Sequence, residues 1–186
     1  MKKRTWAIAA VATSAIAMAA VPAVNAMAED PQPSSAGHWC DTDEPQPLYE
    51  LVSSDGTGRL YTLNKGEADD AVSKHHMTLE EEPVAYLPCR EFSESVTWHR
   101  LKPSETADAW LLTRGDSDEA EQLEAEGWVN EGVTGFAYRD SEGKILLNRY
   151  TNGEEWRVAP ESEEDALSDE GYKVDGPLGY AYEEAP

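Results

Sequence analysis

Residues 126–138 read EGWVNEGVTGFAY, and residues 170–182 read EGYKVDGPLGYAY, so the chain states nearly the same thirteen residues twice. The likeness extends upstream. Residues 112–123 and 156–167 are each twelve residues long, and each ends in leucine shortly before the Glu-Gly-aromatic triplet. Self-similarity at a fixed spacing is the signature of a repeat architecture. These stretches therefore decide the expected fold.

A fainter third copy precedes both of the others. Residues 61–72 also span twelve positions and lead toward Ala85-Tyr86, which corresponds to Ala137-Tyr138 and Ala181-Tyr182. Upstream of the three copies, the residue pairs at matching places are Glu50-Leu51, Arg100-Leu101 and Arg149-Tyr150. The sequence predicts three pseudo-repeats, which are residues 48–89, 97–140 and 145–184.

Each unit follows the same order of expected elements. Two short apolar or aromatic segments joined by a turn read as strands, and an acidic helix and a last strand follow. The expected helix start signals are Asp116 with Glu119 and, more weakly, Ser162 with Asp165. Each helix should end at a glycine, Gly127 or Gly171, where a residue free to take positive φ is needed.

The last strand of each unit carries two aromatic residues on either side of an alanine. Phe136 and Tyr138, like Tyr180 and Tyr182, lie two residues apart and so share one face of a strand. We expect that face to pack in the core. Since no unit is large enough to bury its own apolar face, the units should pack on one another. The expected fold is mainly β with short helices, in a closed β-trefoil-like body; a linear stack of units is the alternative.

The N-terminal 28 residues have the pattern of a secretory signal peptide. A basic start precedes an apolar run and then small residues, with cleavage expected after Ala28 or, alternatively, after Ala26. A retained membrane anchor is the other interpretation of this segment. Residues 29–47 are rich in Pro, Asp and Ser and are expected to form an extended arm, followed by a three-repeat domain over 48–186. The chain is thus expected to be secreted.

The mature chain would carry a formal net charge of −25, since removal of the leader takes three positive charges from the total of −22. Such a charge repels phosphate backbones and anionic lipid, which argues against nucleic-acid and membrane partners. It favours secreted proteins with basic surfaces or a cation-rich wall; simple solubility is the alternative explanation. In an oxidising compartment, Cys40 and Cys89 are expected to form a disulfide worth about 4 kcal/mol on the entropic model.

The second and third units resemble a family of secreted bacterial repeats found beside cell-wall hydrolases, whose function is unsettled. The matching residues are Arg100, Leu112, Leu123, Gly127, Trp128, Glu131, Gly132, Phe136 and Tyr138, and again Arg149, Trp156, Leu167, Gly171, Tyr172, Asp175, Gly176, Tyr180 and Tyr182. The resemblance implies a wall-facing or complex-forming role and supplies no catalytic residue. In its layout alone, an exported acidic domain behind a flexible arm, the chain is similar to the small adaptor subunits of actinobacterial umbrella toxin particles.

Catalytic patterns are absent from the sequence. It holds no Gly-x-Ser-x-Gly string, and its four histidines, His38, His75, His76 and His99, make no HExxH spacing. The acidic cluster around Asp116 fits helix capping better than Ca²⁺ binding, because the twelve-residue EF-hand loop is missing. We therefore expect no enzyme, no metal and no cofactor.

Aromatic residues that do not recur are candidates for binding, since repeat packing does not require them. They are Trp39, in the arm beside His38, Asp41 and Asp43, and Trp98 in the second unit. The first hypothesis is a secreted adaptor whose arm docks a partner protein. The alternatives are a cell-wall carbohydrate-binding module and an inhibitor of a secreted hydrolase.

Overall fold

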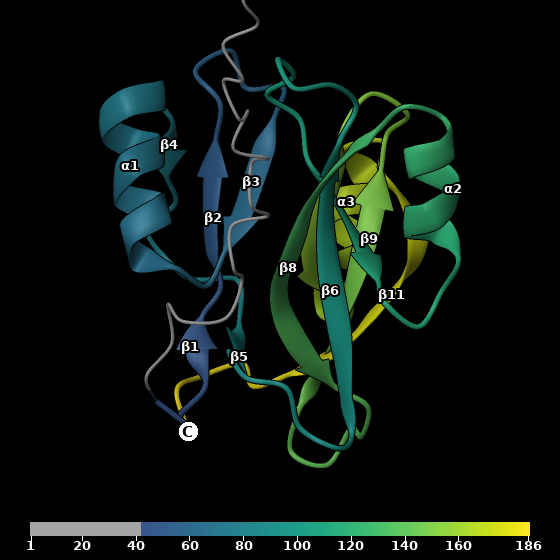
Figure 1. The fold of residues 1–186 in the computed structure, drawn as a ribbon. Helices are drawn as coiled ribbons and strands as arrows, with labels where there is room; N and C mark the ends of the chain where they lie inside the picture. Colours follow the sequence, from purple (N-terminus) through teal and green to yellow (C-terminus); the bar gives the residue numbers. More distant parts are fainter. Residues whose placement is uncertain (1–41) are drawn as a thin grey trace, which may run out of the picture. The chain divides into compact units, whose positions relative to one another are not determined.

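The computed structural model describes residues 42–186, all of which belong to one compact unit, and this part of the chain is mainly β with short helices (Figure 1). The elements fall into three consecutive groups. The first group comprises β1 (Gln46–Pro47), β2 (Tyr49–Val52), β3 (Arg59–Thr62), α1 (Lys65–His75), β4 (Thr78–Leu79) and β5 (Tyr86–Leu87). The second comprises β6 (Ser95–Lys102), β7 (Leu111–Arg114), α2 (Glu119–Ala125) and β8 (Val129–Tyr138). The third comprises β9 (Ile145–Thr151), β10 (Trp156–Pro160), the 3₁₀ helix η1 (Glu161–Glu163), α3 (Glu164–Asp169) and β11 (Lys173–Ala181).

The same antiparallel strand order recurs in each group. The orders are β3-β2-β4, β7-β6-β8 and β10-β9-β11, with β2, β6 and β9 in the middle. The second and third groups join into one six-stranded sheet because β11 pairs with β8 at Tyr180 and Tyr138. In the first group the segment Glu80-Glu81-Glu82-Pro83 interrupts the last strand, and β5 pairs with β1 instead.

The expected closed body is not found, because all three sheets of residues 42–186 are open. β10 and β7 are the free edges of the six-stranded sheet, and β3 and β4 are those of the three-stranded sheet. Within residues 42–186, the strand pairing between the first and third groups is limited to an isolated bridge between Tyr86 and Tyr182. Proline cannot donate to a strand ladder, so Pro83 helps to explain why this connection does not extend into a full strand pair.

The helices end as the repeated Glu-Gly-aromatic triplets predict. Gly127 and Gly171 take φ of +98° and +94°. The amides of the aromatics that follow them donate to carbonyls five residues back: Trp128 N to Leu123 O at 3.0 Å and Tyr172 N to Leu167 O at 2.9 Å. This is the Schellman arrangement, which satisfies carbonyls at the helix end. The first group has no glycine here, and His76 itself takes φ of +56°.

The predicted helix starts are wrong. The N-cap of α2 is Asp118 and makes no side-chain cap, while the Asp116 carboxylate is engaged by Arg114 and Arg139. Ser162 lies inside η1, and the N-cap of α3 is Glu163. Charged partners close in space compete for a carboxylate that a sequence pattern assigns to the backbone.

The prediction for the last strands is right about alternation and wrong about which face is buried. Ala85, Ala137 and Ala181 are fully buried in the main core cluster. The aromatics beside them lie on the other face and are half-buried, with Tyr138 packed edge-on against Tyr182 at a centroid distance of 5.3 Å. The alanines of the last strands therefore lie on the face that meets the core, and the aromatic rings lie on the other face.

Candidate functional site

The first and second groups are joined by a buried guanidinium. Arg100, on β6, donates through Nε to Glu131 at 2.8 Å and through Nη2 to Glu67 of α1 at 2.6 Å. Its Nη1 also reaches the carbonyl of Tyr61 at 3.3 Å. Burial opposes charge on the pair, but the hydrogen bonds from Arg100 prevail and hold the pKa of Glu67 below its ordinary value. We call this contact the first–second junction.

The second and third groups are joined in the same way. Arg149, on β9, donates through Nε to Asp175 at 2.6 Å, through Nη2 to Glu119 of α2 at 2.6 Å, and through Nη1 to the carbonyl of Leu112 at 2.7 Å. The side chain of Arg149 is only 8% exposed. In each of these two junctions one arginine therefore donates hydrogen bonds to an acid of its own group, to an acid on the helix of the preceding group, and to a strand carbonyl of that preceding group. We call this one the second–third junction.

Strand register identifies the residue at the matching position of the first group. Arg100 faces Leu112, Arg149 faces Val158, and Glu50 faces Tyr61. A glutamate thus occupies the place where the other two groups have arginine. The sequence alignment put Trp156 beside Leu112, whereas the register puts Val158 there and Trp156 two residues earlier.

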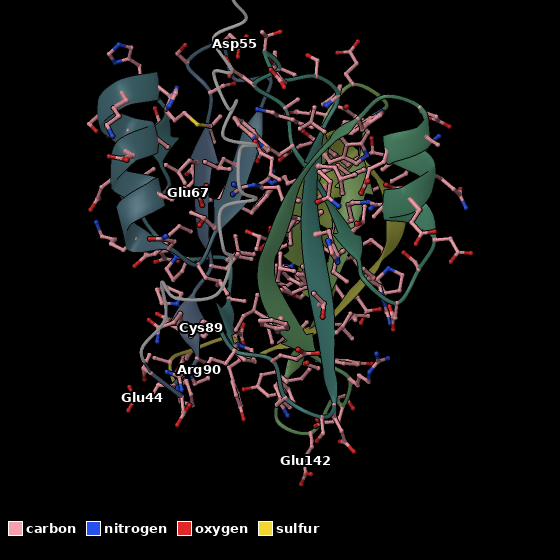
Figure 2. All side chains as sticks on the ribbon, viewed as in Figure 1. Glu44, Asp55, Glu67, Cys89, Arg90 and Glu142 are labelled. Carbon is pink, nitrogen blue, oxygen red and sulfur yellow. The ribbon has the colours of Figure 1, made fainter. Side chains whose placement is uncertain are left out.

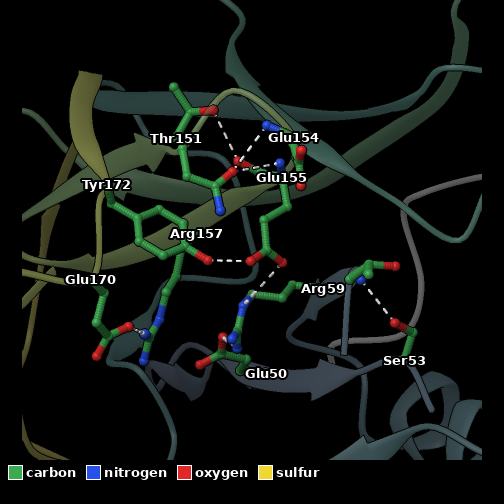
Figure 3. A network of polar contacts seen from close by, with 12 residues as sticks. Glu50, Ser53, Arg59, Thr151, Glu154, Glu155, Arg157, Glu170 and Tyr172 are labelled. Atoms are coloured by element: carbon green, nitrogen blue, oxygen red, sulfur yellow. Dashed lines mark hydrogen bonds and ion pairs between the residues drawn. The ribbon is translucent and has the colours of Figure 1, made fainter. Parts of the chain in front are cut away.

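The contact between the third and first groups, the third–first junction, has a different network (Figure 3). The carboxylate of Glu50, whose side chain is 9% exposed, accepts from Arg59 Nη1 at 2.6 Å and from Tyr61 Oη at 2.9 Å. Tyr61 Oη in turn accepts from the amide of Val158 at 2.9 Å, which links the two groups. Burial, and next the charge of Glu50, raises the pKa of Tyr61 well above its ordinary value.

Arg59 extends this network toward the third group. Its Nε lies 3.9 Å from Glu155 Oε2, too far for a hydrogen bond, and Glu155 also accepts from Tyr172 Oη (Figure 3). Burial and this hydrogen bond raise the pKa of Tyr172 to about 12. At this junction three buried polar atoms make no hydrogen bond within residues 42–186: Arg59 Nε, Glu155 Oε2 and Arg157 Nε. Such atoms cost free energy and are rare in folded proteins, so each of them calls for an explanation such as a water molecule or a bound group.

A cavity of about 460 Å³ opens at the third–first junction. Its lining is charged and comprises Glu50, Arg59, Glu80, Glu81, Glu82, Pro83, Val84, Arg157, Val158, Ala159 and Glu163. Arg59 is engaged by Glu50, and Arg157 reaches out to Glu170 at 3.4 Å. Within residues 42–186 no hydrogen bond or ion pair engages the carboxylates of Glu80, Glu81, Glu82 or Glu163. The cavity can therefore accept a cationic group.

A second cavity, of about 730 Å³, lies beside α1 at the first–second junction. Trp110 lines it together with Met77, Arg100 and Glu131, and the indole Nε1 of Trp110 donates to Glu131 at 3.0 Å. The arginine of this junction is already paired here. An aromatic ring beside polar groups is a surface that suits a sugar ring or a partner side chain.

The residues predicted to bind a partner are not assembled into one site. Trp98 is fully buried, and its Nε1 donates to the carbonyl of Leu178 at 2.9 Å. It is a core residue whose side chain has no exposed surface, which corrects the prediction that it contacts a partner. Asp43 is 93% exposed and pairs with Arg90 at 3.0 Å. The other predicted contact residues, His38, Trp39 and Asp41, lie outside the described residues.

The two cysteines are described only in part. Cys89 is disulfide-bonded and nearly buried, at the end of the segment that follows β5 (Figure 2). Its Sγ lies 3.5 Å from the carbonyl of Thr42. Cys40 lies outside the described residues, so its pairing with Cys89 stays a prediction. This contact places Thr42, which belongs to the expected arm, beside Cys89.

Sequence reasoning missed the third–first junction, although a signal for it was present. Glu50 was aligned with Arg100 and Arg149, and nothing was drawn from the exchange of a positive for a negative charge. In the second and third groups this position holds an arginine that pairs with acids. Its replacement by glutamate in the first group marks a junction with a different role.

Two further features concern the described part of the chain. No helix within residues 42–186 has the length and apolar character needed to cross a bilayer. In the same part, no group of three or more His, Cys, Asp or Glu side chains is arranged to hold a metal ion.

The three groups of strands coincide with the region that matches a family model. The family model described as "Domain of unknown function (DUF5648)" matches residues 47–182, and the chain belongs to that family. The match begins within β1 and runs one residue past β11, so it covers all three groups of strands. No curated protein matches the chain. No solved structure matches it either.

Proposed function

We propose that the chain is a non-enzymatic secreted adaptor, a scaffold subunit of an extracellular complex such as a toxin particle. The observation that carries this proposal is the cavity at the third–first junction, whose free carboxylates face an open space between two groups of strands. An acidic surface of this kind selects a partner with a basic side chain, and the net charge of the chain speeds the approach of such a partner.

The expected arm gives the adaptor a second contact. Its last two residues form β1, which pairs with β5 and so joins the arm to the body. A segment held at one end and extended beyond it suits docking into a neighbouring protein. On this proposal, the body binds one secreted protein and residues 29–47 engage another.

An approximate threefold arrangement of the groups is part of the same proposal. It is supported by the matching strand orders and by the matching registers of Glu50, Arg100 and Arg149. Two of the junctions then hold the scaffold together, and the third is left for a partner.

Capture from culture supernatant tests the adaptor proposal. The tagged, exported chain is compared with a cavity variant (Glu80→Gln, Glu81→Gln, Glu82→Gln) and with a control that removes three charges from α2 and its C-cap (Glu121→Gln, Glu124→Gln, Glu126→Gln). We expect mass spectrometry to find a basic secreted protein with the native chain and the control, and to lose it with the cavity variant. Capture of nothing above empty resin would contradict the proposal, as would equal capture by all three chains.

A carbohydrate-binding module is the second candidate, favoured by Trp110 at the larger cavity. It predicts that the chain sediments with isolated cell walls and that Trp110→Ala releases it, while Trp156→Ala, a change at the corresponding position of the third group, does not. Unchanged sedimentation of the Trp110 variant would reject this candidate. Inhibition of a secreted hydrolase would use the same contacts as the adaptor, and an activity assay on the captured protein separates the two.

A further inference from the structure

We propose that the third–first junction is a receptor for an arginine side chain that a partner protein supplies. This inference rests on the proposed adaptor function and names the group that the cavity takes. It comes from comparison of the three junctions within this one chain. Two of them are filled by an arginine of the chain itself, and the third is not.

The filled junctions define what an arginine needs at this position. In the second–third junction the guanidinium of Arg149 has three kinds of acceptor: Glu119 on the preceding helix, the carbonyl of Leu112, and Asp175 at the start of the acid-Gly pair in β11. Arg100 has the same three kinds in Glu67, Tyr61 O and Glu131. Acceptors in three directions suit the flat guanidinium fork, whose donors point outward in one plane.

The third–first junction has a residue at the position of each of these three kinds of acceptor. Glu163 ends η1 and immediately precedes α3, Val158 has the register of Leu112, and Glu80 lies opposite Glu50, whose carbonyl accepts from the Glu80 amide at 3.0 Å. All three line the cavity. What is missing is the arginine, because Glu50 stands in its place.

Arg59 does not take over the missing role. It lies two residues before Tyr61, as Trp156 lies two before Val158 and Trp110 two before Leu112. From that position it pairs with Glu50 and approaches Glu155, and no ion pair joins it to Glu80 or Glu163 within residues 42–186. The first group has thus exchanged an arginine and a tryptophan for a glutamate and an arginine. The exchange neutralises Glu50 internally and leaves Glu80 and Glu163 without a cation.

The cavity is also built to hold the backbone around such a side chain. Its volume of about 460 Å³ lies in the usual range for ligand pockets, roughly 300–1,000 Å³. The unpartnered Nε of Arg157 is a buried donor on its wall, and a peptide carbonyl next to the inserted arginine would satisfy it. An arginine within a peptide fits these groups better than a free cation does.

A peptide titration followed by NMR tests this inference without a known partner. The ¹⁵N-labelled exported chain is titrated with acetyl-Gly-Arg-Gly-amide and, separately, with the same peptide carrying citrulline, which has the shape of arginine and no charge. We expect saturable shifts of the amides of residues 80–84 and 157–159, with binding of the citrulline peptide at least about tenfold weaker. The lysine peptide should also bind less tightly, since it lacks the fork.

A charge variant shows where the peptide binds. Glu80→Gln with Glu163→Gln should weaken binding of the arginine peptide at least about tenfold, whereas Glu121→Gln with Glu126→Gln should leave it unchanged. Equal binding of arginine and citrulline peptides would overturn the inference, and so would the absence of shifts at these residues. If the peptide does not bind but the native chain still captures a basic protein, the adaptor proposal stands and the arginine receptor falls. If the peptide binds but no secreted protein is captured, the arginine receptor stands and the adaptor proposal falls.

Discussion

Replacing Arg149 with methionine should destabilise the fold far more than removing an exposed arginine does. The guanidinium of Arg149 joins two groups of strands through four hydrogen bonds of 2.6–3.0 Å to Glu119, Asp175 and the carbonyl of Leu112. Methionine fills much of the same space but leaves these acceptors without their donor.

The magnitude follows from burial. Breaking a buried ion pair by removing one partner costs about 3–5 kcal/mol. Here Arg149 is 8% exposed, but Glu119 is 36% and Asp175 30% exposed, so water can solvate both carboxylates in the variant. We therefore expect a loss of about 3 kcal/mol for Arg149→Met. Arg149→Lys keeps the charge without the fork and should fall between the variant and the native chain.

Urea unfolding monitored by tryptophan fluorescence, with the disulfide kept oxidised, measures these losses. The matched control is Arg139→Met, since Arg139 is 48% exposed and pairs with Asp116 at 2.8 Å. A surface pair of this kind contributes about 0–1 kcal/mol. If Arg149→Met and Arg139→Met lose the same free energy of unfolding, the buried arginine does not hold the groups together.

Three other expectations follow from particular residues. Burial and a hydrogen bond from its hydroxyl raise the pKa of Tyr172 to about 12. The contribution of this residue to stability is therefore complete below pH 10 and is lost as the pH rises from about 10 to 12. In Tyr172→Phe the free energy of unfolding should change less with pH over that window. Gly171→Ala, at φ of +94°, should cost about 1 kcal/mol, while Gly176→Ala, where φ is not positive and nothing lies near, should cost less than half of that in the same urea assay. Trp98→Ala should cost about 3–5 kcal/mol and leave capture of any partner unchanged in those molecules that fold, because Trp98 is fully buried; loss of capture by folded protein would restore it as a contact residue.

The repeated triplets carry enough information to place the helix ends, because the requirement for positive φ is local and falls on Gly127 and Gly171. The alternation of the last strands was equally readable, since the period of a strand is local too. Which face is buried is not local. Ala137 is buried and Tyr138 is half-buried because contacts with the other groups of strands decide which face of the strand meets the core.

The candidate site depends on contacts between groups, which explains why sequence patterns did not find it. Arg100 was recognised as part of a motif, but its acceptor Glu67 lies on the helix of the preceding group. The carboxylate of Asp116 was assigned to a helix cap and instead pairs with Arg114 and Arg139. Long charged side chains choose partners by distance in the folded chain, and spacing along the sequence says little about that distance.

The central claim is that the third–first junction accepts an arginine because the chain does not supply one. The double variant Glu50→Arg with Arg59→Trp gives this junction the residues of the other two, and its binding of acetyl-Gly-Arg-Gly-amide is the most direct test. We predict a folded variant that keeps its amide shifts away from the junction and no longer binds the peptide, because its own guanidinium fills the site. A variant that unfolds, or one that binds the peptide as tightly as the native chain does, would contradict the claim.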